Sequence, residues 1–379
     1  MRKNIVAYLT LVIGLLIFSG CSHDSIEPTT KIDDKVIDNS EIQKVDQQAT
    51  SHSTLKVHYL DVGQADATLL QLFDQDETIN LLIDTGDWNT SDVVTYLHSQ
   101  NIEDIDIIAV THPHADHIGQ LDKIIEDFSV TEVWMNGETA TSQVFAKSLE
   151  AIEKHDVDYY EPEVGEIFDI GPLEITVLHP DALSANTNNN SLAMRLQYGE
   201  VSFLFTGDAE QQAENAILAS GANIQAKILH LGHHGSNTSS TPDFVQAVNP
   251  EIAIYSAGVD NSYGHPDAEV VDRIHASNIP LYGTDTHGTI IVETDGKSYT
   301  IMTDKQGTLP RSPTGQSCLD INTASDEELQ EITHIGPTLA DSVIKLRPFR
   351  SVDELTNVKG IGPGRLHDIK SQGLACVGG

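Results

Sequence analysis

The sequence predicts a mixed α/β domain followed by a small all-helical domain. Between residues 55 and 305, short apolar runs rich in β-branched residues, which are typical of buried strands, alternate with longer stretches of helical periodicity. Residues 306–316, rich in Gly, Pro, Ser and Thr, have the composition of a linker. Residues 317–379 then repeat one pattern at an interval of 26 residues. The 379 residues are enough for two hydrophobic cores.

The α/β elements are expected in a regular order along the chain. Strands are expected at 56–61, 67–73, 79–83, 105–110, 131–135, 173–178, 192–198, 201–205 and 227–231, and helices at 92–99, 121–128 and 143–155. Helix and strand alternate twice more after this, and a hairpin across Asp295 and Gly296 closes the domain. The pattern alone predicts only the mixed α/β class.

The composition is strongly acidic. The chain has 57 Asp and Glu against 21 Lys and Arg, a formal net charge of −36. This charge favours solubility and repels polyanions at long range, so any nucleic-acid function must hold phosphates without an overall basic surface. The 3 cysteines exclude a fold held by many disulfides but allow one bridge.

The N-terminal residues 1–20 have the features of an export signal. A positively charged start and an apolar run through Phe18 precede small residues and Cys21. This order resembles a bacterial lipoprotein signal, which implies lipid on Cys21 and attachment to the outer face of the cell membrane. The alternative is an uncleaved anchor, and both place the rest of the chain outside the cytoplasmic membrane. Residues 21–54 are polar and predict a disordered tether.

The segment 111–117 is the main candidate for chemistry. Directly after a predicted strand it places His112, His114, Asp116 and His117. Loops at the carboxyl ends of strands are where α/β folds place reactive groups, and imidazoles with a carboxylate at this spacing suit zinc or a similar divalent metal. The alternative is an ordinary polar loop in a chain with 17 histidines. Further candidate ligands after later strands favour the metal site.

Three motifs together resemble the metallo-β-lactamase-fold hydrolases, and in particular the hydrolase domain of ComEC-type competence proteins. They are Leu60-Asp61-Val62-Gly63-Gln64-Ala65-Asp66-Ala67, Leu82-Ile83-Asp84-Thr85-Gly86 and the histidine segment. The resemblance covers residues 55–305. It implies a four-layer αββα sandwich and a site for two metal ions.

The resemblance also implies a ligand set. It assigns His112, His114 and His179 to one metal, Asp116, His117 and one of His233 and His234 to the other, and Asp208 to both. Of the pair, His234 is expected to bind metal and His233 to face the substrate, although the reverse is the alternative. His179 has the alternative of a plain loop residue, with Asn190 as a substitute contact.

Other residues are expected to assist the metals. Asp84 is expected to orient a ligating histidine. Asp116 and Asp208 are expected to orient the attacking water, and His265 to donate a proton to the substrate or leaving group, unless it lies in an ordinary surface loop. Two divalent ions ~3.5–4 Å apart activate water and offset phosphate charge in an acidic pocket. Zinc is the default for this ligand set, and manganese is the alternative.

The repeat in residues 317–379 has two copies. Ser325–Leu329 matches Ser351–Leu355, and Ile335-Gly336-Pro337 matches Ile361-Gly362-Pro363. Each Ser-x-x-Glu run predicts a capping box at a helix start. The arrangement resembles tandem helix-hairpin-helix DNA-binding domains of the ComEA type.

Hairpins of this kind bind phosphate through backbone N–H groups, because glycine lets the backbone come close and a helix N-terminus favours anions. The residues expected to contact DNA are Ile335, Gly336, Thr338, Lys359, Gly360, Ile361, Gly362, Gly364 and Arg365. Such binding is independent of base sequence. His334 stands where glycine is usual, so we expect the second hairpin to be the stronger site. A role in protein contacts is the alternative.

Cys318 and Cys376 lie at the two ends of this small domain. Because an exported chain meets an oxidising environment, a disulfide between them is expected to stabilise the domain by about 3–4 kcal/mol. The sequence as a whole favours a surface-anchored, metal-dependent phosphodiesterase acting on DNA and linked to competence. The alternatives are a hydrolase of another cell-surface phosphodiester and a DNA receptor with a non-catalytic hydrolase domain.

Overall fold

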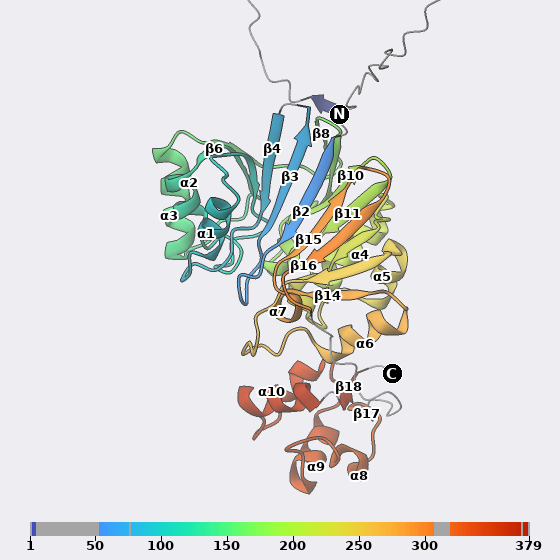
Figure 1. Ribbon diagram of the computed structural model, residues 1–379. Coiled ribbons are helices and arrows are strands. Elements are labelled where there is room, and N and C mark those ends of the chain that lie inside the picture. The colour runs from blue at the N-terminus through green and yellow to red at the C-terminus, as the bar shows by residue number, and fades with distance from the viewer. Residues whose placement is uncertain (1, 5–52, 76, 307–318, 373, 378–379) are drawn as a thin grey trace, which may run out of the picture.

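The computed structural model describes residues 2–4, 53–75, 77–306, 319–372 and 374–377. Cys21, Cys318 and nearly all of the predicted tether and linker lie outside these residues. The described chain forms a two-sheet sandwich with a small helical domain beneath it (Figure 1). Among the described helices, none is long and apolar enough to cross a membrane.

The first sheet has the strand order β16-β15-β2-β3-β4-β5-β6-β7. Its strands are β2 (Thr54–Tyr59), β3 (Thr68–Asp74), β4 (Glu77–Ile83), β5 (Asp104–Ala109), β6 (Ser129–Trp134), β7 (Asp158–Tyr160), β15 (Ile290–Thr294) and β16 (Tyr299–Thr303). Pairing is antiparallel from β16 to β4 and parallel from β4 to β7. The carboxyl ends of β4 and β5 therefore lie side by side, with Ile83 opposite Ala109.

The second sheet has the order β1-β8-β9-β10-β11-β12-β13-β14. Its strands are β1 (Arg2–Asn4), β8 (Ile167–Ile170), β9 (Leu173–His179), β10 (Ala193–Tyr198), β11 (Val201–Phe205), β12 (Ile228–His230), β13 (Ile252–Tyr255) and β14 (Leu281–Gly283). The strands from β11 to β14 are parallel, so their carboxyl ends also share one edge. The edge strand β1 belongs to the start of the predicted signal segment and pairs with β8.

Helices cover the outer faces of both sheets. The first sheet carries α1 (Asp92–Ser99), α2 (Leu121–Asp127) and α3 (Gln143–Lys154), and the second carries α4 (Gln211–Ser220), α5 (Pro242–Val248) and α6 (Ala268–Ala276). A short helix α7 (Thr284–His287) follows β14. A central cluster that includes Tyr59, Phe203 and Ile254 fills the space between the sheets. The αββα sandwich is thus confirmed.

Helix α4 and strands β7 and β8 were not expected from the sequence. Helix α4 buries a carboxylate, Glu214, together with Ala213 and Ile217, so its apolar periodicity is weak. The Glu214 carboxylate accepts hydrogen bonds from the backbone N–H groups of Ser240 and Thr241. Strands β7 and β8 have only 3 and 4 residues, too few for an alternating pattern to stand out.

The C-terminal domain has its own core. Its elements are β17 (Leu319–Asp320), α8 (Asp326–Leu329), α9 (Pro337–Leu346), the 3-10 segment Val352–Asn357, α10 (Pro363–Gln372) and β18 (Ala375–Cys376). Among the described residues, the cluster that includes Leu329, Val343 and Ile369 draws only on residues 319–377. Strands β17 and β18 pair in parallel and bring the two ends of the domain together.

The two predicted capping boxes have different outcomes. Ser325 accepts from the N–H of Glu328, whose carboxylate accepts from the N–H of Ser325, so this box is confirmed. The box at Ser351 is wrong: no side-chain cap forms, and the Glu354 carboxylate accepts from the N–H of Arg350 instead. The segment that follows is a 3-10 helix, whose tighter turn does not bring the serine and glutamate into the box geometry.

Cys376 is disulfide-bonded. Its expected partner Cys318 lies outside the described residues, but the neighbouring Leu319 and Asp320 pair with Ala375 and Cys376. The Cys318–Cys376 bridge therefore stays a prediction that the strand pairing supports.

Candidate metal centre

The histidine segment lies in the loop after β5, held by backbone hydrogen bonds to two neighbouring loops. The N–H of Asp66 donates to the carbonyl of Asp116 at 3.0 Å, and the N–H of Thr85 to that of His117. The loop then turns at Gly119, where an added Cβ would lie 2.2 Å from the backbone nitrogen of Trp88. This close packing keeps the segment in one conformation.

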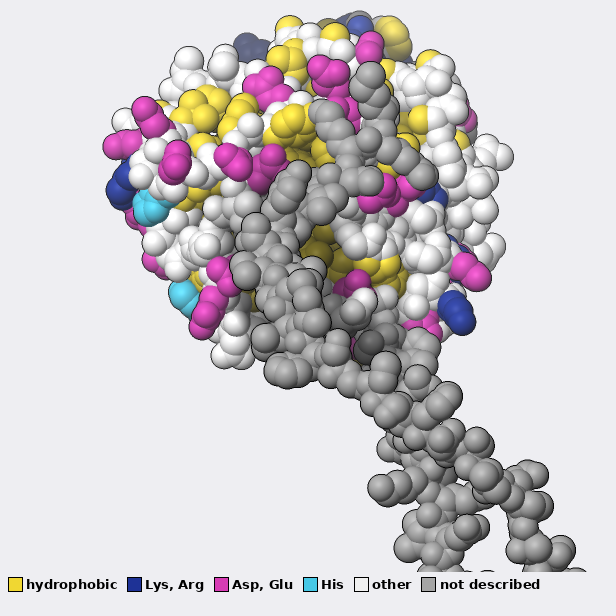
Figure 2. Space-filling model, turned by 90° about the horizontal axis from the view of Figure 1, so that it is seen from above, with side chains coloured by type: hydrophobic (Ala, Val, Ile, Leu, Met, Phe, Trp, Pro, Cys, Tyr) yellow, Lys and Arg dark blue, Asp and Glu magenta, His cyan; other side chains and the backbone are white. Residues whose placement is uncertain are grey.

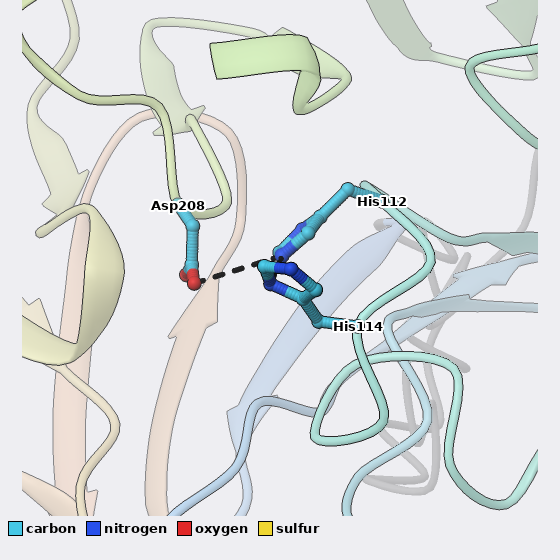
Figure 3. A group of neighbouring side chains, drawn as sticks. All are labelled: His112, His114 and Asp208. Atoms are coloured by element: carbon cyan, nitrogen blue, oxygen red, sulfur yellow. Dashed lines mark hydrogen bonds and ion pairs between the residues drawn. The ribbon is translucent and has the colours of Figure 1, made fainter. Parts of the chain in front are cut away.

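One group of candidate ligands consists of His112, His114 and Asp208. Figure 3 shows the two imidazoles, which come from the loop after β5, and the carboxylate of Asp208, which comes from the loop after β11, converging on one point. His112 Nε2 lies 2.9 Å from His114 Nδ1 and 3.6 Å from Asp208 Oδ2. His112 and Asp208 are buried, whereas His114 is exposed.

A second group consists of Asp116, His117 and His234. His117 Nε2 lies 3.2 Å from Asp208 Oδ1, and His234 Nε2 lies 3.4 Å from Asp116 Oδ2 and 3.9 Å from Asp208 Oδ1. Asp208 therefore lies against both groups, as expected for a shared ligand.

Three of the atoms that point into this centre have ion-pair neighbours but no hydrogen-bond partner. His117 Nε2, His234 Nε2 and Asp208 Oδ1 are buried and accept or donate no hydrogen bond. Buried polar atoms without a hydrogen-bond partner are costly, so several of them around one point are the arrangement that a bound cation would satisfy. Imidazole nitrogens and carboxylates are the donors that zinc and manganese accept. The residues present thus fit divalent metal ions.

Hydrogen bonds behind the ligands orient their rings. His117 Nδ1–H donates to Asp84 Oδ2 at 2.8 Å, and His234 Nδ1–H donates to the carbonyl of Ser256 at 3.0 Å. His112 Nδ1 lies 3.0 Å from the hydroxyl of Thr111, which in turn donates to Asp84. Each bond places the ring proton on Nδ1 and leaves Nε2 facing the centre. Asp84 thus occupies the orienting position expected from the sequence.

The buried imidazoles and carboxylates of the cluster shift one another's pKa values. Burial lowers the pKa of His112 well below its ordinary value, so its ring is neutral. Burial has the same effect on His117, but the carboxylates of Asp208 and Asp84 outweigh it and raise the pKa well above the ordinary value. Burial of Asp208 is likewise outweighed by His117, and its pKa falls well below the ordinary value. Without metal a proton occupies this site, and a cation would replace it.

His179 is not brought into either group. It is buried at the end of β9, and its Nε2–H donates to the carbonyl of Asn189 at 2.8 Å. The alternative contact Asn190 also points away, because its amide bonds Glu138 and Ser184. The assignment of His179 to a metal therefore finds no support among the described candidate groups.

Asn188 and Ser191 occupy the space beside the first group, and sequence reasoning missed both. Asn188 lines the cavity above the metal centre, with a buried Oδ1 that has no hydrogen-bond partner. Ser191 Oγ lies 3.4 Å from His112 Nδ1 and accepts from the N–H of Asp208. The available signal was the run of asparagines at 188–190 directly before a strand.

The cavity has a volume of about 330 Å³ and opens onto the metal centre. Its lining includes Gln64, His114, Asp116, Asp208, His233, His234, Tyr263 and His265. His233 is not in a ligand group, although its Nε2 lies 3.6 Å from Asp208 Oδ2. His265 lies beside it, with ring centroids 5.7 Å apart. The placement agrees with His234 as ligand and His233 as the substrate-facing residue.

A second buried layer lies beneath the metal centre. Asp66, Asp84 and His117 form a third group of buried carboxylates and imidazole. Asp66 Oδ1 is 3.5 Å from His230 Nε2, which contacts the hydroxyl of Ser256. Sequence reasoning gave no role to Asp66 or His230, although Asp66 belongs to a motif that carried the resemblance.

The hairpins of the C-terminal domain are open to solvent at their glycines. A Cβ added at Gly336, Gly362 or Gly364 would meet nothing within 4 Å. In the second hairpin Gly360 has φ +112, and in the first His334 takes the matching left-handed position with φ +65. The His334 ring bonds Asp368 at 2.5 Å. The backbone of the second hairpin is thus accessible to a phosphate.

Comparison with known proteins agrees with this geometry. The sequence pattern of the Metallo-beta-lactamase superfamily matches residues 60–259, and that of the helix-hairpin-helix motif matches residues 316–372. The chain belongs to the metallo-beta-lactamase superfamily. It carries the superfamily's hydrolase fold, with candidate divalent-metal ligands, joined to a helix-hairpin-helix motif.

Relatives of this chain include competence proteins. ComE operon protein 3 of Bacillus subtilis is 30% identical over 253 residues, covering 62% of this chain and 32% of the relative. Competence protein ComA of Neisseria gonorrhoeae is 28% identical over 249 residues, covering 64% of this chain and 33% of the relative. A deoxyribonuclease of Thioalkalivibrio is 43% identical over 60 residues, covering 16% of this chain and 17% of the relative. The chain thus spans about a third of the length of the competence proteins.

Proposed function

We propose that this chain is a metal-dependent phosphodiesterase that cleaves DNA held by its helix-hairpin-helix domain. The observation that supports this most directly is Asp208, which lies against both groups of candidate ligands, with His117 Nε2 and His234 Nε2 within 4 Å of its carboxylate and without hydrogen-bond partners. The cavity above them has room for a phosphodiester. The attached motif and the deoxyribonuclease relative favour DNA as the polymer.

The chemistry divides between the metals and the side chains. Two zinc or manganese ions held by these groups would supply Lewis acidity, activating water and offsetting the charge of the phosphate. Asp116 and Asp208 would hold the water in line with the phosphorus. Burial lowers the pKa of His233, so its ring is neutral and can accept a proton at Nε2. His265, on the same wall, would donate a proton to the leaving oxygen.

DNA would be held through its phosphate backbone. Gly362 directly precedes α10 and Gly364 lies in its first turn, both with open space around them, and Lys359 and Arg365 flank them. Backbone donors suit a chain of net charge −36, because they bind phosphate without adding to an overall basic surface. The face seen from above in Figure 2, away from this domain, carries many acidic and few basic side chains. DNA is therefore expected to approach from the domain side.

We also propose that lipid on Cys21 anchors the protein at the outer face of the cell membrane, from which it can be released. The support is the order of residues 1–21 alone. Incorporation of labelled fatty acid into the intact chain but not into Cys21→Ser would test this. A role in DNA uptake is part of the same proposal, supported by the competence relatives.

The first experiment is cleavage of double- and single-stranded DNA by residues 22–379, stripped of metal and then given Zn²⁺ or Mn²⁺. His114→Ala is the test variant, and His155→Ala, an exposed histidine at the end of α3, is the matched control. We expect metal-dependent cleavage that His114→Ala abolishes and His155→Ala keeps. DNA binding without cleavage under both metals would instead favour a DNA receptor or another phosphodiester substrate.

Removal of residues 317–379 tests whether the helix-hairpin-helix domain recruits DNA to the metal centre. If the domain recruits DNA, the truncated chain should lose activity on long DNA far more than on a small diester such as bis(p-nitrophenyl) phosphate. Unchanged activity on long DNA would contradict recruitment by this domain.

A further inference from the structure

Lys370 is a buried lysine where the two domains meet. It belongs to α10 of the helix-hairpin-helix domain, and its side chain is only 4% exposed. Its ammonium contacts Asp267 Oδ1 at 2.8 Å, Asp353 Oδ1 at 3.1 Å and the carbonyl of Tyr263 at 3.3 Å. An ammonium has three N–H donors, so each has an acceptor. Asp353 belongs to the same domain as Lys370, whereas Asp267 and Tyr263 belong to the hydrolase domain.

The hydrolase side of this contact leads directly to the cavity. Tyr263 and His265 line the cavity wall, and their rings stack with centroids 6.0 Å apart. Asp267 Oδ2 lies 3.5 Å from His265 Nδ1. The N–H of Asp267 donates to the carbonyl of Gly235, the residue after His234. One carboxylate thus joins the lysine of one domain to the cavity wall of the other.

We propose that Lys370 is a positioning residue of the active site: inserted between Asp267 and the carbonyl of Tyr263, it holds the loop of residues 258–267 so that His265 faces the metal centre. The helix-hairpin-helix domain is then a structural part of the site as well as a DNA holder. This inference rests on the proposed function for its activity readout, but the loop ordering can be measured without any activity.

The burial of the ion pair is what makes this contact specific. A buried lysine that loses its partner is strongly unfavourable, so Lys370 and Asp267 stay buried only while the domains are docked. The phosphate-binding hairpin at Gly362 lies at the other end of α10, about 12 Å from Lys370 at the helical rise. A docked α10 therefore also sets the direction in which DNA leaves the hairpin relative to the cavity.

The test uses Lys370→Met in residues 22–379, with bis(p-nitrophenyl) phosphate as a substrate too small to reach the hairpin. Misplacement of a reacting group by about 1 Å costs on the order of 100-fold, so we expect kcat to fall by about 10- to 100-fold with little change in KM. Lys345→Met is the matched control, because Lys345 is an exposed lysine of the same domain that forms an ion pair with the exposed Asp341. It should leave kcat within about twofold of the parent, the spread of ordinary surface changes.

A double variant separates positioning from general destabilisation. If Lys370 acts through His265, then Lys370→Met in a His265→Ala background should cost less than about threefold, because groups that act as one unit are not additive. An equally large loss in both backgrounds, or no loss in the parent background, would overturn the proposal. Should Lys370→Met fail to fold, Lys370→Gln keeps a polar head without charge and should show the same pattern, more weakly.

Hydrogen exchange tests the loop independently of any reaction. Backbone amides of residues 258–267 should exchange faster in Lys370→Met than in the parent and in Lys345→Met. Unchanged exchange there would overturn the proposal even if the variant were less active. If the parent hydrolyses no phosphodiester while exchange in 258–267 responds as expected, the proposed function fails and the positioning role of Lys370 stands.

Discussion

The replacement Asp84→Asn should weaken metal binding while leaving the fold intact. Asp84 is buried and accepts three hydrogen bonds: from the N–H of Thr111 at 2.7 Å, from its hydroxyl at 2.8 Å and from His117 Nδ1–H at 2.8 Å. An asparagine of the same shape can keep one oxygen toward the Thr111 N–H. Its amide NH₂ then faces His117 Nδ1, where a donor would meet a donor.

His117 can relieve this conflict only by moving its proton. If Nδ1 accepts from the new amide, the proton moves to Nε2, the atom 3.2 Å from Asp208 Oδ1 that points into the metal centre. A protonated nitrogen cannot bind a metal. Losing one charge-assisted hydrogen bond costs about 1.5–3 kcal/mol, which corresponds to a roughly 10- to 100-fold loss of metal affinity. Replacement of groups that orient metal ligands has effects of the same order, about 10- to 100-fold.

The assay is a zinc titration against a competing chelator at a fixed pH. Asp106→Asn is the matched control, since Asp106 also accepts a backbone hydrogen bond, from Asn80 at 2.8 Å, but lies on β5 away from the metal groups. We expect full zinc affinity in the control. An Asp84→Asn protein that binds two zinc ions as tightly as the parent would show that the ring of His117 is oriented by something else.

Three further perturbations test the protonation state, the DNA hairpin and the disulfide. Burial opposes the charge of His234, but Asp208 and Asp116 outweigh it and raise the pKa of His234 from 6.5 to about 9. The protonated ring therefore makes its full contribution to the free energy of unfolding below pH 6.5, and this contribution is lost as the pH rises through 9. Urea unfolding of the chelated chain should therefore show lower stability at pH 9.5 than at pH 6.5, with a smaller difference in His234→Gln. Gly362→Ala should leave unfolding unchanged, because its Cβ meets open space, yet lower DNA affinity by about tenfold in fluorescence anisotropy, since the methyl group keeps phosphate away from the N–H groups. Cys376→Ser should lower the free energy of unfolding of the C-terminal domain by about 3–4 kcal/mol in non-reducing urea.

Each of the three perturbations has a control or an outcome that would contradict it. Added zinc should reverse the pH trend of the chelated chain, because metal binding is favoured as the histidines lose protons. A Gly362→Ala protein with unchanged DNA affinity would place the phosphate site elsewhere. A reducing agent should destabilise the parent as much as the Cys376→Ser change does and should not affect that variant.

Local sequence signals predicted most of the fold and four of the six residues in the two candidate ligand groups. Helix α1 was expected at 92–99 and forms at Asp92–Ser99, because its apolar residues have clear helical spacing. The ligand candidates of segment 111–117 could be recognised because they lie within six residues of one another. His179 was placed by analogy, and its ring instead bonds the carbonyl of Asn189. Asn188 lines the cavity above the ligand groups, and the run of asparagines at 188–190 was its only local signal.

The sequence by itself determined where strands end, which residue types follow them, and that one repeat makes a second domain. These are local properties, since hydrophobic period, capping residues and turn residues act over a few neighbouring positions. The tertiary structure alone decided which ring nitrogens remain without hydrogen-bond partners and that Lys370 reaches Asp267 across the two domains. In the sequence Lys370 is one basic residue among 21 Lys and Arg. Its burial depends on how two separately folded surfaces pack, and no local pattern in the chain encodes that contact.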